Sequence, residues 1–163
     1  MSTDPPAPPG APTGAGPLRL ADVARFVRER ADGVLTTLGP DGGPQAAYLS
    51  LTATERGELV LDARVTSRTV RNVRRDPRVA VVCGGADGVT LQAEGLAEEV
   101  HGEERRRCAD VYRAAFPRFA GSLADPGIAV VRVSLTWARL GDYRGVAPVL
   151  RETTPDGTHD DVG

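Results

Sequence analysis

The sequence has 163 residues and contains no lysine, because all 20 of its basic residues are arginine. A Schiff-base enzyme and a P-loop phosphate site both need a lysine, so the sequence excludes both. Histidine is nearly absent too: His159 lies close to the C-terminus and His101 is the other one. We therefore expect no Ser-His-Asp triad and no metal site. If the protein is an enzyme, a bound cofactor supplies the chemistry.

The two cysteines, Cys83 and Cys108, give no sign of a cross-link. They lack the paired spacing of a zinc site or of a disulfide framework, so we expect both thiols to be free and buried. No apolar run approaches the roughly 20 residues of a membrane span, and the N-terminus lacks the pattern of a secretory signal. We therefore expect a cytoplasmic protein that does not enter a membrane.

The two ends of the chain differ in composition from the middle. Residues 1–17 are mostly proline, glycine and other small residues, and residues 153–163 are polar and acidic. Such segments have too little apolar surface to offset the entropy lost on ordering, so we predict two disordered tails. Residues 18–152 then form a single domain with one core.

The spacing of apolar residues predicts a mainly β domain with flanking helices. The predicted elements are a helix at 18–31, strands at 33–39, 44–52 and 57–63, a basic helix that ends at Arg75, strands at 78–83 and 89–100, a helix at 102–116 and a strand at 127–143. The turn-rich residues 40–43 join the first two strands as a hairpin, and Gly95 predicts a bulge in the fifth. Six antiparallel strands of this length tend to close into a small barrel.

The segment TSRTVRNVRRDPRVAV, residues 66–81, places five arginines within eleven positions. Ser67 or Thr66 caps the predicted helix, and Asp76-Pro77 ends it, since the residue before a proline avoids helical backbone. The arginines can form a solvated face, neutralise the phosphates of a nucleic acid, or help the helix start to bind a single phosphate group. The net charge of −2 and the 4% of aromatic residues argue against nucleic acid.

A resemblance favours the single phosphate group. The succession GVLTTLGPDGGPQAAYLSL, GELVLDARVTSRTVRNVRRDPRVAVV, VTLQAEGLAEEV and TWARLGDYRG resembles, in order and spacing, the pyridoxamine 5'-phosphate oxidase-like family of flavin-binding split barrels. The match covers nearly all of residues 31–145. It implies a six-stranded antiparallel split β-barrel that forms a two-fold homodimer with two flavin sites at the subunit interface. In relatives the flavin is FMN, and in a large actinobacterial branch it is the deazaflavin F420.

The resemblance also implies which residues contact the cofactor. The matching positions are Ala47, Tyr48, Leu49, Ser50, Asp62, Ala63, Ser67, Arg68, Thr69 and Thr90. Ser67 and Arg68 match the pair that holds the phosphate, and residues 47–52 match the strand beside the isoalloxazine ring. Lysine is the usual residue where Thr69 stands, and a hydroxylated residue is usual at Ala63. Both changes remove a phosphate donor, and Arg64 or Arg71 is the candidate to replace the charge.

Two functions fit this pattern. One is an FMN- or F420-dependent oxidoreductase that transfers a hydride between the flavin and a small organic substrate, with no residue that stands out as a catalytic acid or base. The other is a dimer with a degenerate phosphate cradle that works as a cofactor-free tailoring enzyme or as a flavin- or small-ligand-binding protein. Oxidation of pyridoxamine phosphate itself is not expected, because the C-terminal region is short and acidic. The arginine-rich, lysine-free composition indicates a GC-rich bacterial genome.

Overall fold

The computed structural model describes residues 16–155. The two predicted disordered tails lie outside this range except for their innermost residues. Of these, Gly16 and Pro17 accept hydrogen bonds from the Arg151 guanidinium through their carbonyl oxygens, at 2.8 and 3.0 Å. The beginning of the described chain is therefore attached to its C-terminal part.

The described residues form three α-helices, each followed by a group of strands. The helices are α1 (Leu20–Arg30), α2 (Arg68–Arg75) and α3 (Gly102–Ala115), with 3₁₀ turns at Pro117–Phe119 and Ser122–Ala124. The strands are β1 (Asp32–Leu38), β2 (Pro44–Ser50), β3 (Thr52–Ala53), β4 (Leu59–Arg64), β5 (Arg78–Gly84), β6 (Val89–Glu99), β7 (Ile128–Asp142) and β8 (Val149–Thr153). None of these helices combines the length and the hydropathy that crossing a membrane needs.

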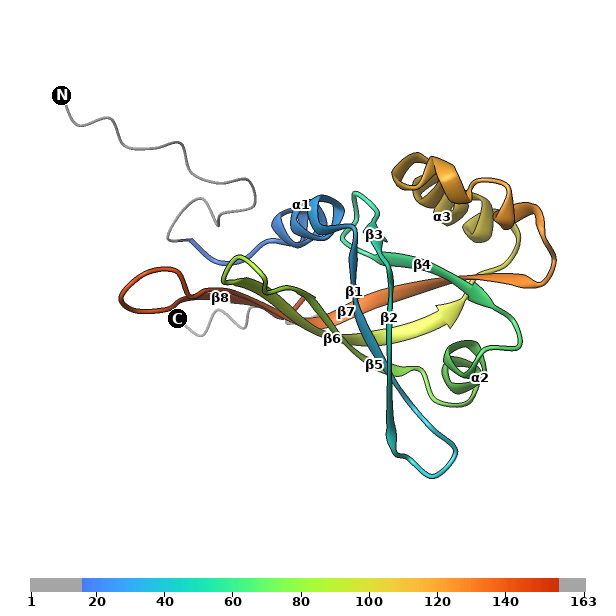
Figure 1. The fold of residues 1–163 in the computed structure, drawn as a ribbon, viewed down its shortest axis with the longest axis horizontal. Helices are drawn as coiled ribbons and strands as arrows, with labels where there is room; N and C mark the ends of the chain where they lie inside the picture. The colour runs from blue at the N-terminus through green and yellow to red at the C-terminus, as the bar shows by residue number, and fades with distance from the viewer. Residues whose placement is uncertain (1–15, 156–163) are drawn as a thin grey trace, which may run out of the picture.

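All of these strands belong to one antiparallel sheet, with the order β2-β1-β5-β6-β7-β4-β3 and with β8 paired to β7. The sheet curls into an open half-barrel, with α1 and α3 above it in Figure 1 and α2 at its lower right. The predicted mainly β fold with flanking helices is confirmed. The structure adds β3 and β8 to the six predicted strands. β3 has only two residues and β8 depends on pairing with β7, so neither carries a clear local pattern.

The predicted bulge at Gly95 is confirmed, because the register between β6 and β7 shifts between Glu94 and Gly95. Glycine is needed there for close packing rather than for its backbone angles. A Cβ atom at Gly95 would lie 2.5 Å from the carbonyl oxygen of Ser134 and 2.8 Å from a methyl carbon of Val133. Any side chain at this position would push β6 and β7 apart.

Two hydrophobic clusters lie on opposite faces of the sheet. The larger one fills the inside of the curl, where Leu59 and Leu61 of β4 pack together with residues of α1 and α2. The smaller one lies under α3, where Val60 of β4 packs with Cys108 and Tyr112. Successive side chains of β4 thus point alternately into the larger and the smaller cluster. A shift of β4 by one residue would exchange these two sets of side chains, so the two clusters fix the register of this strand.

A buried ion pair joins β8 to α1. Arg151 lies 3.1 Å from Asp22, and the side chains are 8% and 5% exposed. Asp22 also accepts hydrogen bonds from Arg19 and Arg25, each at 3.3 Å. Burial alone would raise the pKa of Asp22, but the hydrogen bonds from Arg19 and Arg151 outweigh it and the pKa is lowered.

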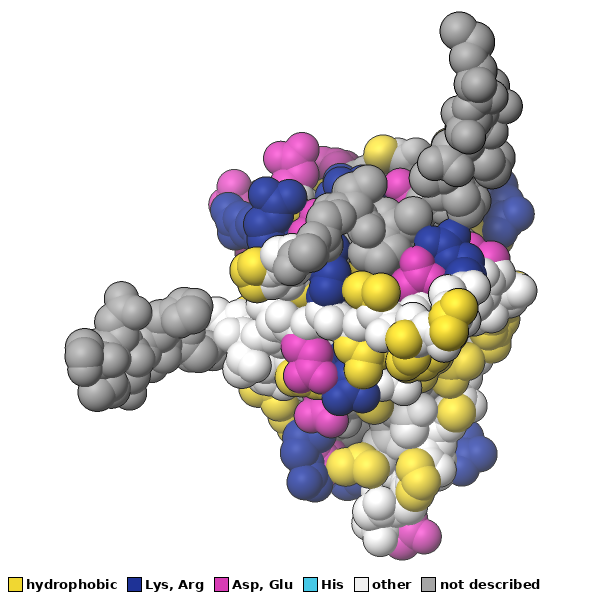
Figure 2. All heavy atoms as spheres, turned by 90° about the vertical axis from the view of Figure 1, so that its left-hand side faces the viewer, with side chains coloured by type: hydrophobic (Ala, Val, Ile, Leu, Met, Phe, Trp, Pro, Cys, Tyr) yellow, Lys and Arg dark blue, Asp and Glu magenta, His cyan; other side chains and the backbone are white. Residues whose placement is uncertain are grey.

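Part of the outer face of the sheet, beyond the area that α3 covers at β4, is exposed, and this uncovered face includes residues of β2, β5 and β6. Along β5 every second residue is exposed, and the register places Tyr48 and Val82 on either side of Val34 on this face. Tyr48 is 72% exposed, and Leu96 of β6 is 48% exposed on the same face. Figure 2 shows further hydrophobic side chains, in yellow, at the end of the molecule that holds the β7–β8 hairpin. Exposed apolar surface of this kind is typical of an interface with another chain.

Candidate functional site

The N-terminus of α2 presents unpaired backbone donors. Ser67 caps the helix in extended backbone, and its Oγ accepts a hydrogen bond from the N–H of Val70 at 3.2 Å. The N–H groups of Arg68 and Thr69 have no acceptor among the described residues. The positive end of the helix dipole lies here as well, so this end favours an anion. Of the two predicted caps, Ser67 and Thr66, the structure has Ser67, and the predicted end at Arg75 is confirmed.

Two arginines of α2 add positive charge that the described part of the chain does not neutralise. Arg68 and Arg71 are three positions apart, so they lie on one side of the helix. Both are exposed, and no Asp or Glu within residues 16–155 forms an ion pair with either. Arg74, on another side of the helix, differs because it pairs with Glu99 at 2.6 Å. A solvated face paired with carboxylates therefore describes Arg74 but not Arg68 and Arg71.

A groove of 390 Å³ lies between α2 and the β1–β2 hairpin. Its lining residues are Pro40, Gln45, Arg68, Arg71, Asn72 and Arg75. Asn72 is 3% exposed, and its Nδ2 donates to Thr37 Oγ1 and to Gln45 Oε1, both at 2.9 Å. Arg75 donates to the carbonyl oxygen of Leu38 at 2.8 Å and to Asn72 Oδ1 at 2.9 Å. These bonds fasten the hairpin to α2 and leave Arg68 and Arg71 as the guanidinium groups of the groove that no described residue hydrogen-bonds. Arg75 has no carboxylate partner among the described residues either, so its charge adds to theirs.

The residues predicted to lie beside a cofactor ring are on β2, at one edge of the sheet. Among the described strands β2 pairs only with β1, so its other edge presents free backbone N–H and C=O groups. Ala47, Leu49 and Ser50 are partly buried, whereas Tyr48 points to the uncovered face. Gln45 of the groove is also on β2, at i−2 from Ala47. Because alternate residues share a face of a strand, Gln45, Ala47 and Leu49 form one row that starts at α2.

Asp62 and Ala63 lie on β4, which contacts both β2 and α2. They point to opposite faces: Ala63 packs against the core inside the curl, and Asp62 faces α3. Asp62 accepts a hydrogen bond from the hydroxyl of Tyr112 at 2.8 Å. Burial and this bond raise the pKa of Tyr112, so its hydroxyl is protonated at neutral pH. The Asp62 carboxylate is therefore engaged with α3.

The family model described as pyridoxamine 5'-phosphate oxidase matches residues 21–140. The chain belongs to the pyridoxamine 5'-phosphate oxidase family. The match takes in β2, β4, α2 and β6, so every residue of the groove lies within it. No curated protein matches the chain.

Solved structures share the family's fold. A heme-binding protein from Mycobacterium smegmatis has a TM-score of 0.70 and 21% identity, over 86% of this chain and 60% of that one. A conserved hypothetical protein from Mycobacterium tuberculosis has a TM-score of 0.66 and 26% identity, over 78% and 86%. HutZ, the heme storage protein from Vibrio cholerae, has a TM-score of 0.61 and 17% identity, over 72% and 91%. The chain thus spans 60% of the length of the M. smegmatis protein.

Thr90 is a predicted site residue that the structure does not bring to the groove. Thr90 lies near the start of β6, where it pairs with Gly84 of β5 and Gly141 of β7. The segment that follows α2 contacts the other end of β6, because the N–H of Ala97 donates a hydrogen bond to the carbonyl oxygen of Pro77. The strand between Thr90 and Ala97 spans roughly 23 Å at about 3.3 Å per residue. Within one protomer, Thr90 therefore does not reach the groove.

Sequence reasoning missed three residues that line the groove: Gln45, Asn72 and Arg75. Asn72 carried a signal, because it is a polar residue next to the apolar face of a helix whose buried residues include Val73. Of the two candidates to replace the missing lysine, Arg71 lines the groove, whereas Arg64 is exposed at the end of β4 and does not line it.

Proposed function

We propose that the protein is a homodimeric flavin-dependent oxidoreductase that holds the flavin phosphate at the start of α2, with FMN as the first candidate and F420 as the alternative. The observation that carries the proposal is the pair of unneutralised guanidinium groups, Arg68 and Arg71, beside free helix-terminal N–H groups in a groove of 390 Å³. Backbone donors, a helix dipole and guanidinium groups together suit a phosphate dianion. Membership of the pyridoxamine 5'-phosphate oxidase family supports the same ligand class.

The groove fits a phosphate despite the changes at Thr69 and Ala63. Arg71 provides the cation that the lysine-free chain lacks at Thr69, and a guanidinium fork matches two phosphate oxygens. The Ala63 side chain packs inside the curl, so a hydroxyl there would be partly buried in apolar surroundings. The phosphate is then held by Arg68, Arg71 and the backbone rather than by a lysine and a hydroxyl.

The row of β2 residues that starts at Gln45 gives the orientation of the ring. The free edge of β2 supplies backbone N–H and C=O groups, which suit the polar edge of a flavin, and Leu49 supplies apolar contact. When bound, the flavin supplies the hydride transfer, and the protein contributes orientation and exclusion of water. The hydrogen bond from Tyr112 to Asp62 holds α3 against β4, which contacts β2.

The homodimer is supported by the uncovered sheet face and by the position of Thr90. Exposed Tyr48, Val82 and Leu96 give this face an apolar centre that a second copy can cover. Thr90 does not reach the groove of its own protomer. A two-fold partner that covers the face can bring its own Thr90 to the cofactor, which is how this predicted residue contributes in the proposal.

Binding of heme is the second candidate, because two of the similar structures are of heme-binding proteins. Heme iron needs an axial ligand such as histidine, cysteine, tyrosine or methionine. Within residues 16–155 the histidine is His101, which lies at the start of α3 in a pocket with Arg74 and Arg105, not in the groove. Both cysteines are buried. The exposed tyrosines Tyr48 and Tyr143 remain as candidate axial ligands, but neither lines the groove, so the groove favours a flavin over heme.

The purified protein, titrated separately with FMN, F420 and hemin and followed by absorbance, tests these proposals. We expect saturable FMN or F420 binding that weakens about tenfold or more in Arg68→Ala and in Arg71→Ala, since each removes a charge-assisted hydrogen bond. The matched control is Arg113→Ala on α3, which removes an ion pair with Asp110, and neither of these residues lines the groove.

The outcomes of this titration distinguish the flavin site from heme binding, and an oxidoreductase from a binding protein. Binding of neither flavin, or binding unchanged in both α2 variants, contradicts the proposed site. Binding of hemin alone supports the second candidate. Bound flavin that no nicotinamide donor reduces favours a binding protein over an oxidoreductase.

A further inference from the structure

A pocket of 400 Å³ lies beside α2, on a different side of this helix from the groove. Its walls come from α2, α3, the loop after β4, the end of β6 and the start of β7. Figure 1 shows this part of the molecule, where the arrow of β6 ends near α2. The pocket and the groove share no lining residue, so they are separate cavities. The volume is within the range typical of small-molecule sites.

Arg105 of α3 gives this pocket a positive charge that the described carboxylates do not neutralise. Its Nη2 donates a hydrogen bond to the carbonyl oxygen of Leu123 at 3.0 Å, and no Asp or Glu within residues 16–155 forms an ion pair with it. The bond to Leu123 uses one of the five N–H donors of the guanidinium and holds the partly buried side chain in place. The other donors are available to a ligand.

His101 adds a second donor from the same helix. It is the N-cap residue of α3 and lies four positions before Arg105, so the two side chains are neighbours on the helix surface. The imidazole makes no capping hydrogen bond to the backbone of α3. An imidazole carries at least one N–H donor, which can point into the pocket that both residues line.

The acidic residue of the pocket is already paired. Glu99 is the one carboxylate among the described residues that line the pocket, and Arg74 of α2 lies 2.6 Å from it. Glu103 and Asp125 are close in sequence to lining residues, but both are exposed and neither lines the pocket. With Glu99 neutralised, the charge of Arg105 remains, and the pocket favours an anion over a cation.

The rest of the lining is apolar. It consists of Val65, Pro126 and Ile128, and none of the three is fully buried. The N–H of Val65 donates to the carbonyl oxygen of Gly127 at 2.9 Å, which joins the loop after β4 to the segment that leads into β7. This surface offers contact to hydrocarbon, so it suits an anion that carries an organic group better than a bare inorganic ion.

We propose that this pocket binds a small organic phosphate. Arg105 and His101 hold the phosphate group together with Arg74, and the organic group lies against Val65 and Ile128. A phosphate suits these donors because a guanidinium binds two phosphate oxygens and leaves a third for the imidazole. The proposal does not depend on the flavin, since no residue that carries it lines the groove.

Titration of the full ¹⁵N-labelled chain with phenyl phosphate, and separately with inorganic phosphate, followed by amide chemical shifts, tests this proposal. Phenyl phosphate is expected to give saturable shifts at His101, Arg105 and Ile128, with a Kd of roughly 0.1–2 mM. Inorganic phosphate is expected to bind there about fivefold more weakly, because it lacks the apolar group. Either phosphate can also enter the groove, and shifts at Arg68 and Thr69 report that binding separately.

Charge variants assign the shifts to the pocket. Arg105→Gln is expected to weaken binding at the pocket about tenfold and to leave the shifts at the groove unchanged. The matched control Arg106→Gln removes the same charge from the next position of α3, which is exposed and does not line the pocket, and it is expected to keep the affinity. Arg68→Ala is expected to do the reverse of Arg105→Gln, with loss at the groove alone. Failure of this proposal is thereby distinguishable from failure of the flavin site.

A second pair of variants keeps the test independent of charge. Pro126→Trp fills the pocket from an exposed lining position, and Ala124→Trp places the same side chain at an exposed position that does not line it. We expect the first to abolish the shifts at His101 and Arg105 and the second to keep them, with both variants as folded as the wild type by circular dichroism. Absence of saturable shifts at these two residues, equal affinity for the two phosphates, equal losses in Arg105→Gln and Arg106→Gln, or full binding by Pro126→Trp would each overturn the proposal.

Discussion

The substitution Asp22→Asn is expected to lower the free energy of unfolding by about 3 kcal/mol at neutral pH. Asparagine keeps the shape of aspartate but removes the charge that compensates Arg151, whose side chain is only 8% exposed. Breaking a buried ion pair by removing one partner costs about 3–5 kcal/mol, because the other charge is left buried. The lower value is expected here, since the carbonyl oxygens of Gly16 and Pro17 still accept hydrogen bonds from Arg151.

Thermal unfolding followed by circular dichroism measures this effect. At about 3 °C for each kcal/mol in a domain of this size, Tm is expected to fall by about 10 °C. The control is Asp110→Asn, which removes an exposed ion pair with Arg113 from a side chain that is 75% exposed. The control is expected to change Tm by no more than about 2 °C. Equal losses in the two variants would refute the view that Asp22 and Arg151 fasten β8 to α1.

The lowered pKa of Asp22 determines how the free energy of unfolding changes with pH. A carboxyl group whose pKa is lower in the folded state stabilises the fold above its unfolded pKa, which is about 3.9. This stabilisation is lost as the pH falls through the folded value. The gap in unfolding free energy between the wild type and Asp22→Asn is therefore full at pH 7 and shrinks below about pH 4. A gap that stayed constant down to about pH 2 would contradict the assignment.

Two further predictions concern buried polar groups. Asn72→Ala is expected to lower the free energy of unfolding, measured in urea, by about 2 kcal/mol, because it leaves Thr37 and Gln45 without their hydrogen-bond donor. A loss below about 0.5 kcal/mol would show that Asn72 does not hold the hairpin. Burial raises the pKa of Cys83 to about 12, and Cys108 is buried too, so native protein at pH 8 is expected not to react with a disulfide reagent until urea unfolds it. Fast reaction of a native thiol would show that the core opens.

Local signals explain what the sequence alone could predict. The cap at Ser67, the stop before Pro77 and the bulge at Gly95 all depend on the chemistry of one to four neighbouring residues. The strands of the curled sheet alternate clearly because one side of them faces a core, as the burial pattern of β5 shows. The order of elements, and with it the family, was accessible for the same reason.

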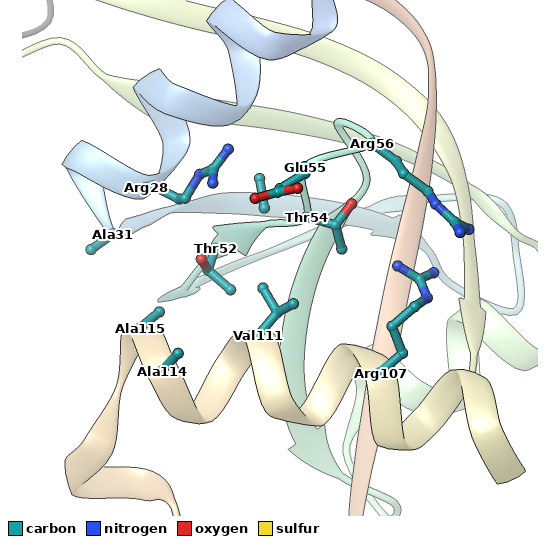
Figure 3. Close-up of a pocket in the computed structure, with 11 residues that line it drawn as sticks. Arg28, Ala31, Thr52, Thr54, Glu55, Arg56, Arg107, Val111, Ala114 and Ala115 are labelled. Atoms are coloured by element: carbon teal, nitrogen blue, oxygen red, sulfur yellow. The ribbon is translucent and has the colours of Figure 1, made fainter.

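Long-range contacts explain what the sequence did not predict. Asn72 meets Gln45 across the hairpin, and Tyr112 meets Asp62 across 50 positions of the chain. β8 owes its place to pairing with β7 and to the contact between Arg151 and Asp22. The pocket in Figure 3 has walls from three separate elements, with Arg28 on α1, Thr52 on β3 and Val111 on α3, so no single stretch of sequence contains it.

The free edge of β2 has a consequence for handling the protein. The segment PQAAYLS carries no charged side chain, so it lacks the gatekeepers that usually stop strands of different molecules from joining, and only Pro44 blunts its start. Chains with this edge in water can add to one another strand by strand into open-ended polymers. Whatever occupies the edge of β2 therefore also keeps the molecule from polymerising through this strand.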